Sequence, residues 1–133
     1  MELEEINNEF VPHAESLLLK EIGFNAPCLI VYSEKGERSP FSNFFVRNSN
    51  VPSFATGPTY RQAFKWFRDE HRIHSHVKYT DASSKMYYTI EITSYLPFML
   101  GKYVEYETHE EAELICLQKL IEMVKQRKIE KSK

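Results

Sequence analysis

The sequence predicts a small α+β fold, in which helices pack on one face of a small antiparallel sheet in the order α-β-(β)-α-β-β-β-α. Two observations predict it. Segments near the middle and the end of the chain repeat apolar residues at helical spacing, and each begins with a capping-box pattern. Between them, two adjacent segments alternate with a period of two, as the strands of an antiparallel hairpin do.

Three helices are expected from the apolar spacing and from the residues at the helix ends. The first covers about residues 12–22, and Gly23 should end it. The second covers residues 59–71 and opens with a capping box at Thr59. The third opens with a capping box at Thr108 and is apolar over a wide arc. The core residues predicted on the last two helices are Phe64, Phe67 and Leu120.

The strands are predicted from period-two alternation and from short apolar runs bounded by turn residues. They are residues 28–32, 73–79, 86–93 and 102–107, with 41–47 as a further strand that the sequence leaves open. The two long ones form the hairpin. Residues 48–58 are rich in Asn, Ser, Pro and Gly, and they are predicted to be a loop.

The composition is that of one globular domain, residues 1–133, with 42% apolar and 27% charged residues and a net charge of −2. No apolar run reaches the length of a membrane span, and the acidic N-terminus is unlike a signal peptide. Cys28 and Cys116 lack metal-binding spacing and suit a reducing compartment. We therefore expect a cytoplasmic protein with no membrane partner, whose ends, about residues 1–10 and 126–133, are frayed or exposed.

Three histidines, His71, His74 and His76, fall close together and raise the question of a metal site. Structural zinc sites need four ligands and catalytic ones usually three, and no cysteine or HExxH spacing lies nearby. The period changes to two at Ile73, which predicts a helix-to-strand junction instead. His71 then lies at a helix end, where its cation suits the helix dipole, and the other two are solvated. We expect no metal, no cofactor and, without a recognisable catalytic motif, no enzyme activity.

Four basic residues form a stripe along the second predicted helix, at the spacing i, i+4, i+7 and i+11. They are Arg61, Lys65, Arg68 and Arg72, which we call the basic stripe. The stripe predicts either contact with nucleic-acid phosphates or a solvated face, and the sequence leaves both open.

An apolar segment after the predicted hairpin is the second candidate surface. Its members are Tyr95, Leu96, Phe98 and Met99. Such a segment predicts either a protein interface or a cap on the core. The leading hypothesis is therefore a small non-enzymatic binding module that acts on an unknown protein partner or forms a homodimer. Nucleic-acid binding through the basic stripe is the alternative.

Three segments, "APCLIVY", "PTYRQAFKWFRDEH" and "THEEAELICLQKLIEMV", resemble in this order a family of short uncharacterised proteins from gut bacteria, their phages and mobile elements. The resemblance covers about residues 18–124 and implies a fold without an activity. Residues 59–125 are also similar, in the order of their elements, to double-stranded RNA-binding domains. That family grips phosphates with lysines at the start of its last helix. The matching positions here are His109, Glu110, Glu111 and Glu113, so the acidic residues oppose RNA binding there.

The stretch "VYSEKGERSPFSNFF" is similar to small N-glycosidases that clear riboflavin-pathway intermediates, through Ser42, Asn43 and Phe44. The pattern of those enzymes continues with a Glu-His pair after a threonine. In this chain Thr59 is followed by Tyr60, and the acidic residue of the pattern is absent. The resemblance implies N-glycosidase activity as a third alternative.

Overall fold

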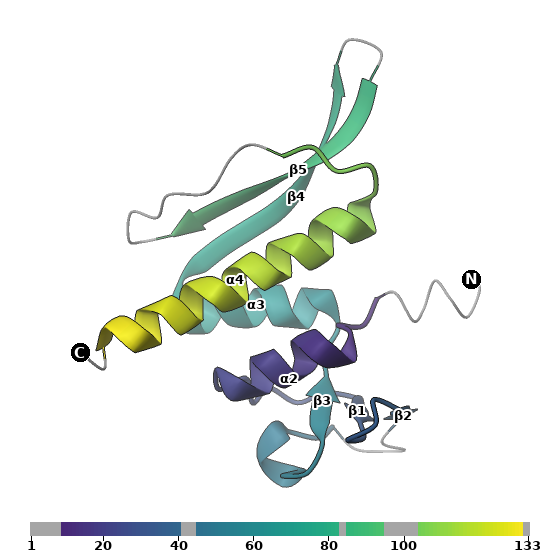
Figure 1. Cartoon of the computed structure of the whole chain (residues 1–133), viewed down its shortest axis with the longest axis vertical. Coiled ribbons are helices and arrows are strands. Elements are labelled where there is room, and N and C mark those ends of the chain that lie inside the picture. The colour runs from purple at the N-terminus through teal and green to yellow at the C-terminus, as the bar shows by residue number, and fades with distance from the viewer. Residues whose placement is uncertain (1–8, 41–44, 83–84, 95–103, 132–133) are drawn as a thin grey trace.

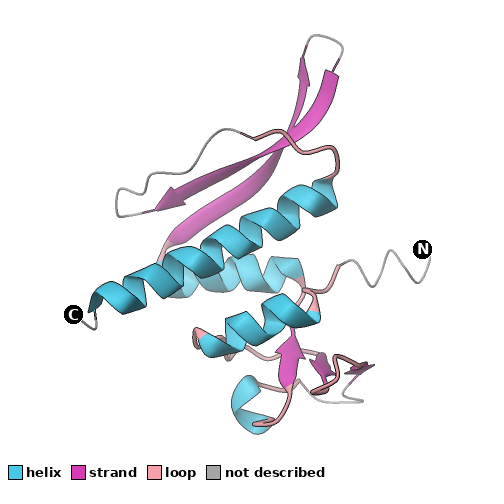
Figure 2. Cartoon of the chain, viewed as in Figure 1, coloured by secondary structure: helices cyan, strands magenta, loops and turns pink. Residues whose placement is uncertain are grey.

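The computed structural model describes residues 9–40, 45–82, 85–94 and 104–131, and it confirms the predicted α+β fold class (Figure 1, Figure 2). The helices of the described residues are α2 (His13–Glu21), α3 (Tyr60–His71) and α4 (His109–Lys131), with a 3-10 helix, η1, at Asn48–Asn50. The strands are β1 (Ile30–Tyr32), β2 (Arg38–Pro40), β3 (Ala55–Gly57), β4 (Ile73–Ala82) and β5 (Lys85–Ser94).

The helix ends follow the signals in the local sequence. α2 ends in a Schellman motif, in which Gly23 has a φ of 101° and the N–H of Phe24 donates to the carbonyl of Leu19 at 2.9 Å. α3 begins with a complete capping box at Thr59. The hydroxyl of Thr108 accepts a backbone N–H in the first turn of α4. Local chemistry therefore fixes where these three helices begin or end.

The predicted sheet is divided into two antiparallel sheets, β2-β1-β3 and the hairpin β4-β5. The prediction of a loop over residues 48–58 is wrong at Ala55–Gly57, which forms β3 and pairs with β1. Asn48 holds this strand in place. Its side-chain oxygen accepts the N–H of Thr56 at 2.9 Å, and its amide group donates to the carbonyl of Phe24 at 2.7 Å.

Two predicted strands lie partly outside the described residues. In 41–47, residues 41–44 are not described, and Val46 pairs with Cys28 in a single antiparallel bridge. In 102–107, residues 102 and 103 are not described, and Tyr106 pairs with Tyr88 of β5. In both segments, the described residues thus form a single bridge and not an extended strand.

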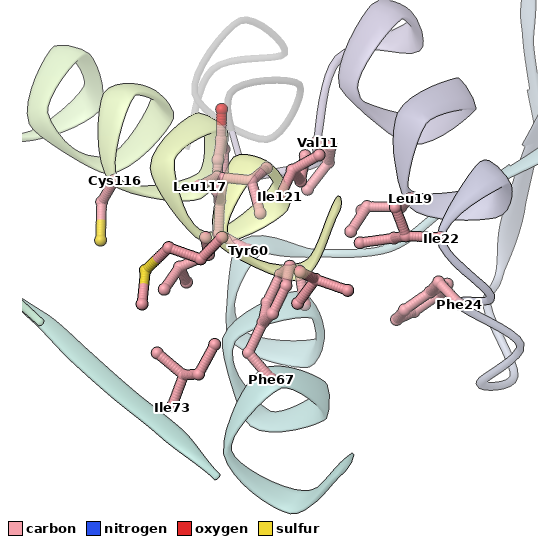
Figure 3. Packing of buried hydrophobic residues seen from close by; sticks show 14 of the residues in the cluster. Val11, Leu19, Ile22, Phe24, Tyr60, Phe67, Ile73, Cys116, Leu117 and Ile121 are labelled. Atoms are coloured by element: carbon pink, nitrogen blue, oxygen red, sulfur yellow. The ribbon is translucent and has the colours of Figure 1, made fainter. Parts of the chain in front are cut away.

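The main core lies between the three helices and the near face of the hairpin (Figure 3). Phe67 and Leu120 have no exposed surface, as predicted, and Phe64 is half-buried against the edge of the cluster. α3 and α4 lie side by side and run in the same direction (Figure 1). Their C-terminal ends are joined by Arg127, which donates to the carbonyl of His71 at 3.0 Å.

The hairpin extends beyond the helices, so that its turn end stands away from the core (Figure 1). α4 continues to Lys131, and most side chains of its last turns are exposed. None of the helices in the described part of the chain combines the length and the apolar character that crossing a bilayer requires.

Candidate functional site

Within the described residues, one edge of β4 has no partner strand, and its direction follows from a contact on the other side of the hairpin. Tyr88 and Tyr106 exchange two backbone hydrogen bonds of 2.8 Å, so the N–H and C=O of Tyr88 point away from β4. Bonded and non-bonded positions alternate along an antiparallel pair. Tyr79, which lies opposite Tyr88, therefore directs its N–H and C=O away from β5. The same alternation applies to Ser75 and Val77.

We call the outward backbone groups of Ser75, Val77 and Tyr79 the outer edge of β4. Within the described residues, β4 pairs with β5 and with no other strand. Unpaired N–H and C=O groups along a strand are a template for pairing with another chain. β4 is ten residues long, which is long for an edge strand. The outer edge of β4 is therefore the candidate interaction site.

Basic side chains occupy every second position along the polar face of β4. They are His74, His76 and Lys78, which we call the basic row, and all three are exposed. Nε2 of His76 lies 3.1 Å from a carboxylate oxygen of Glu91, and Nζ of Lys78 lies 3.6 Å from the other. One carboxylate on β5 thus serves two members of the row.

The structure separates the three histidines that the sequence places together. His71 is half-buried at the end of α3, where its ring meets Trp66 edge-on with centroids 4.7 Å apart. Burial lowers the pKa of His71, and the nearby cations of Arg127 and Lys128 lower it further. Burial and two cations thus oppose the imidazolium that the helix dipole favours.

Among the described residues, no group of three or more His, Cys, Asp or Glu side chains lies close enough together to hold a metal ion. His74 and His76 lie on the exposed face of β4, as predicted. His71 lies on the apolar side of α3 against the core aromatics.

The basic stripe is only partly a continuous surface. Arg61 and Lys65 are exposed, and Lys65 forms an ion pair with Asp69 one turn along the helix. Arg68 is half-buried. Arg72 lies just past the end of α3 with a φ of 53°, in the left-handed region that non-glycine residues rarely adopt. Phosphate contact and a solvated face both stay open for this stripe.

Two further candidate sites of the sequence lie outside the described residues. These are the apolar segment with Tyr95, Leu96, Phe98 and Met99, and the glycosidase-like Ser42, Asn43 and Phe44. Thr59, after which the glycosidase pattern has its Glu-His pair, caps α3 through its side chain.

Both cysteines are buried free thiols, on different elements. Burial raises the pKa of Cys28 to about 11 and the pKa of Cys116 to about 11, because a thiolate loses its hydration in the core. A thiol that stays protonated at neutral pH is a poor nucleophile, so neither cysteine has the surroundings of a reactive one.

Comparisons with known proteins give no further assignment: no family model matches the chain, and neither the curated proteins nor the solved structures include a significant match. The resemblances drawn from the sequence therefore stay predictions.

Sequence reasoning found the alternation of β4 but missed its free edge. The alternating histidines and lysine give the face of each side chain, but not which backbone groups face outward, because that depends on the register with β5. It also missed a groove beside Trp66, whose lining comes from segments far apart in the chain. No local signal marks such a groove.

Proposed function

We propose that the protein is a non-enzymatic binding module, which takes up an extended, acidic segment of a partner protein as an additional strand on the outer edge of β4. The observation that carries the proposal is the outward row of backbone groups at Ser75, Val77 and Tyr79, which has no partner strand among the described residues. In strand addition, these backbone bonds supply affinity, and side chains at alternate positions supply specificity.

The basic row favours a different chain over a second copy of this one. Antiparallel self-pairing centred on His76, Val77 or Lys78 sets two members of the row opposite each other. Centred on Lys78, for example, it sets the two Lys78 side chains opposite each other. These are non-bonded positions, where facing side chains come closest, and like charges there are destabilising. A strand with carboxylates at those positions meets the same row favourably.

Charge at the start of β4 has the same sign. Arg72 directly precedes β4, and Arg68 lies one helical turn earlier on α3. Both belong to the basic stripe, so the stripe and the basic row meet at the junction of α3 and β4. An acidic segment lying along β4 has basic side chains beside most of its length, and Glu91 competes with it for His76 and Lys78.

The variant Val77→Pro tests the outer edge directly. Proline removes one outward N–H and is tolerated on an edge strand where that N–H faces solvent, so the bonds to β5 stay intact. Val77→Thr is the matched control, because it keeps the N–H and the β preference. The probe is a synthetic peptide of about nine residues, a usual strand length, in which Glu alternates with Thr and Val. A peptide with Lys in place of Glu is its control.

We expect the acidic peptide to bind the unmodified protein and the Thr variant alike, and the Pro variant about tenfold more weakly, which equals about 1.4 kcal/mol. The Lys peptide should not bind. We expect the amides of Ser75, Val77 and Tyr79 to exchange freely in the unbound protein. Binding should protect them from hydrogen exchange. Failure of the acidic peptide to bind, or equal binding to the Pro variant, would contradict the proposal. A concentration-dependent dimer that the Pro variant abolishes would assign the edge to a second copy.

A further inference from the structure

A groove lies where the C-terminal ends of the three helices meet the loop after α2. It has a volume of about 530 Å³, within the range of small-molecule sites in proteins. A second hollow of about 240 Å³ lies on the other side of Trp66 and shares Ala26, Pro27 and Glu70 with the first. Trp66 thus stands between two hollows, with its indole accessible from both.

Trp66 is a fixed aromatic surface. Its ring meets Phe24 at 5.3 Å, Phe67 at 5.1 Å and His71 at 4.7 Å between centroids, each in an edge-to-face arrangement. The side chain is nevertheless only half-buried. These ring contacts hold the indole in place beside the groove and give a preformed platform for a planar group. Little entropy is lost when such a platform is occupied.

Two cations are held at the rim of the groove. Nη1 of Arg47 donates to the carbonyl of Asn25 at 2.8 Å, and Nζ of Lys128 donates to the carbonyl of Ile22 at 2.7 Å. These bonds fix both cationic groups against the loop after α2. The guanidinium of Arg47 has more donor hydrogens than this one bond uses. Tertiary hydrogen bonds therefore hold both basic side chains at the rim of the groove.

The sign of the charge in the groove is positive. Glu70 is the acidic residue among the described residues of its lining, against Arg47 and Lys128. The pKa of His71 shows the same balance of charge. Arg127 and Lys128 lower this pKa by more than Glu70 raises it. An anion entering the groove gains from this field.

We propose that the groove binds a small molecule that joins a planar aromatic ring to a carboxylate. The ring lies against Trp66, and the carboxylate lies between Arg47 and Lys128. An inorganic anion uses only the rim, and a neutral aromatic molecule uses only the platform; the joined molecule uses both. This site is separate from the outer edge of β4 and does not depend on it.

The test uses Trp66, the one tryptophan in the chain, as reporter. Phenylacetate is the probe, with phenylacetamide and acetate as matched controls for the charge and the ring. Binding is followed by the NMR signals of the Trp66 indole N–H and of the His71 ring. We expect phenylacetate to shift both signals and to bind about tenfold more tightly than either control. It should also raise the pKa of His71, because a bound carboxylate favours the imidazolium.

Variants separate the groove from general effects of charge. Arg47→Gln and Lys128→Gln should each weaken phenylacetate binding several-fold and leave the weak binding of phenylacetamide unchanged. Lys125→Gln is the control, since Lys125 lies on α4 outside the groove, 4.0 Å from Glu21. Equal binding of acid and amide, unshifted Trp66 and His71 signals, or an equal loss in the Lys125 variant would each overturn the proposal. If Arg47→Gln is unstable, the test rests on Lys128→Gln, whose spectrum without ligand should show an intact fold.

Discussion

The two sheets are both antiparallel, but they are stabilised in different ways. β1 and β3 are three residues long, and every residue in them is buried. β4 and β5 are ten residues long, and the half near the turn is largely exposed, with Tyr79 50% and Met86 67% exposed. A very short strand depends on the elements packed around it, whereas a long hairpin is sustained by its own cross-strand pairs. Among the described residues, cross-strand pairing of β4 with β5 alone leaves the outer edge of β4 without a partner strand.

The largest expected effect compares one aromatic residue from each region. Phe67→Ala removes a fully buried ring and should lower the free energy of unfolding by about 3–5 kcal/mol. Tyr79→Ala removes a half-exposed ring that meets Tyr88 at 5.3 Å, and it should cost about 1 kcal/mol or less. Chemical denaturation of both variants measures the difference. Similar losses would show that the turn end of the hairpin is part of the cooperative core.

The next effect tests whether β3 depends on long-range support. Asn48→Ala leaves the buried N–H of Thr56 and the carbonyl of Phe24 without their partner, at about 1–3 kcal/mol for each group. We expect a total loss of about 2–6 kcal/mol. Asn50→Ala in the same 3-10 helix is the control, because that side chain is exposed and accepts the exposed N–H of Arg47. If both variants lose the same small amount, β3 is held by other contacts.

The same contrast explains how far the sequence predicts the fold. The hairpin and α3 were predicted well, because period-two alternation and the capping box at Thr59 are local patterns. β3 was missed, because Ala55–Gly57 lies in a turn-rich segment and its pairing comes from Asn48 and from β1. Gly57 reads as a turn residue, yet here it gives room to a neighbour: a Cβ on it would lie 2.7 Å from the ring of Tyr32.

The candidate sites show the same limit. The alternating basic row is visible in the sequence, because its members share one strand. The groove beside Trp66 is not, because Arg47 and Lys128 reach it through bonds to carbonyls on a loop distant from both in the chain. The sequence places His71 at the correct helix end, but the lowering of its pKa by burial and by Arg127 comes from tertiary contacts that no local pattern shows.

The smallest expected effect is on nucleic-acid binding, where we expect none that is measurable at physiological salt. The chain has a net charge of −2, and Lys65 is already paired with Asp69. The start of α4 carries Glu110 and Glu111, which repel a phosphate backbone. Titration of duplex DNA and RNA into the protein at several salt concentrations measures this, with Lys65→Glu/Arg68→Glu as the variant.

If the basic stripe did contact phosphates, its four cations would give a log–log salt slope of about −3.6 on B-DNA. Micromolar binding with such a slope, lost in Lys65→Glu/Arg68→Glu without loss of folding, would contradict the prediction. It would also move the functional surface from the edge of the hairpin to the face of α3. Val77→Pro leaves every cation of the basic stripe in place. It should nevertheless weaken binding of the acidic peptide. The two variants therefore decide between a surface made of backbone groups and one made of charge.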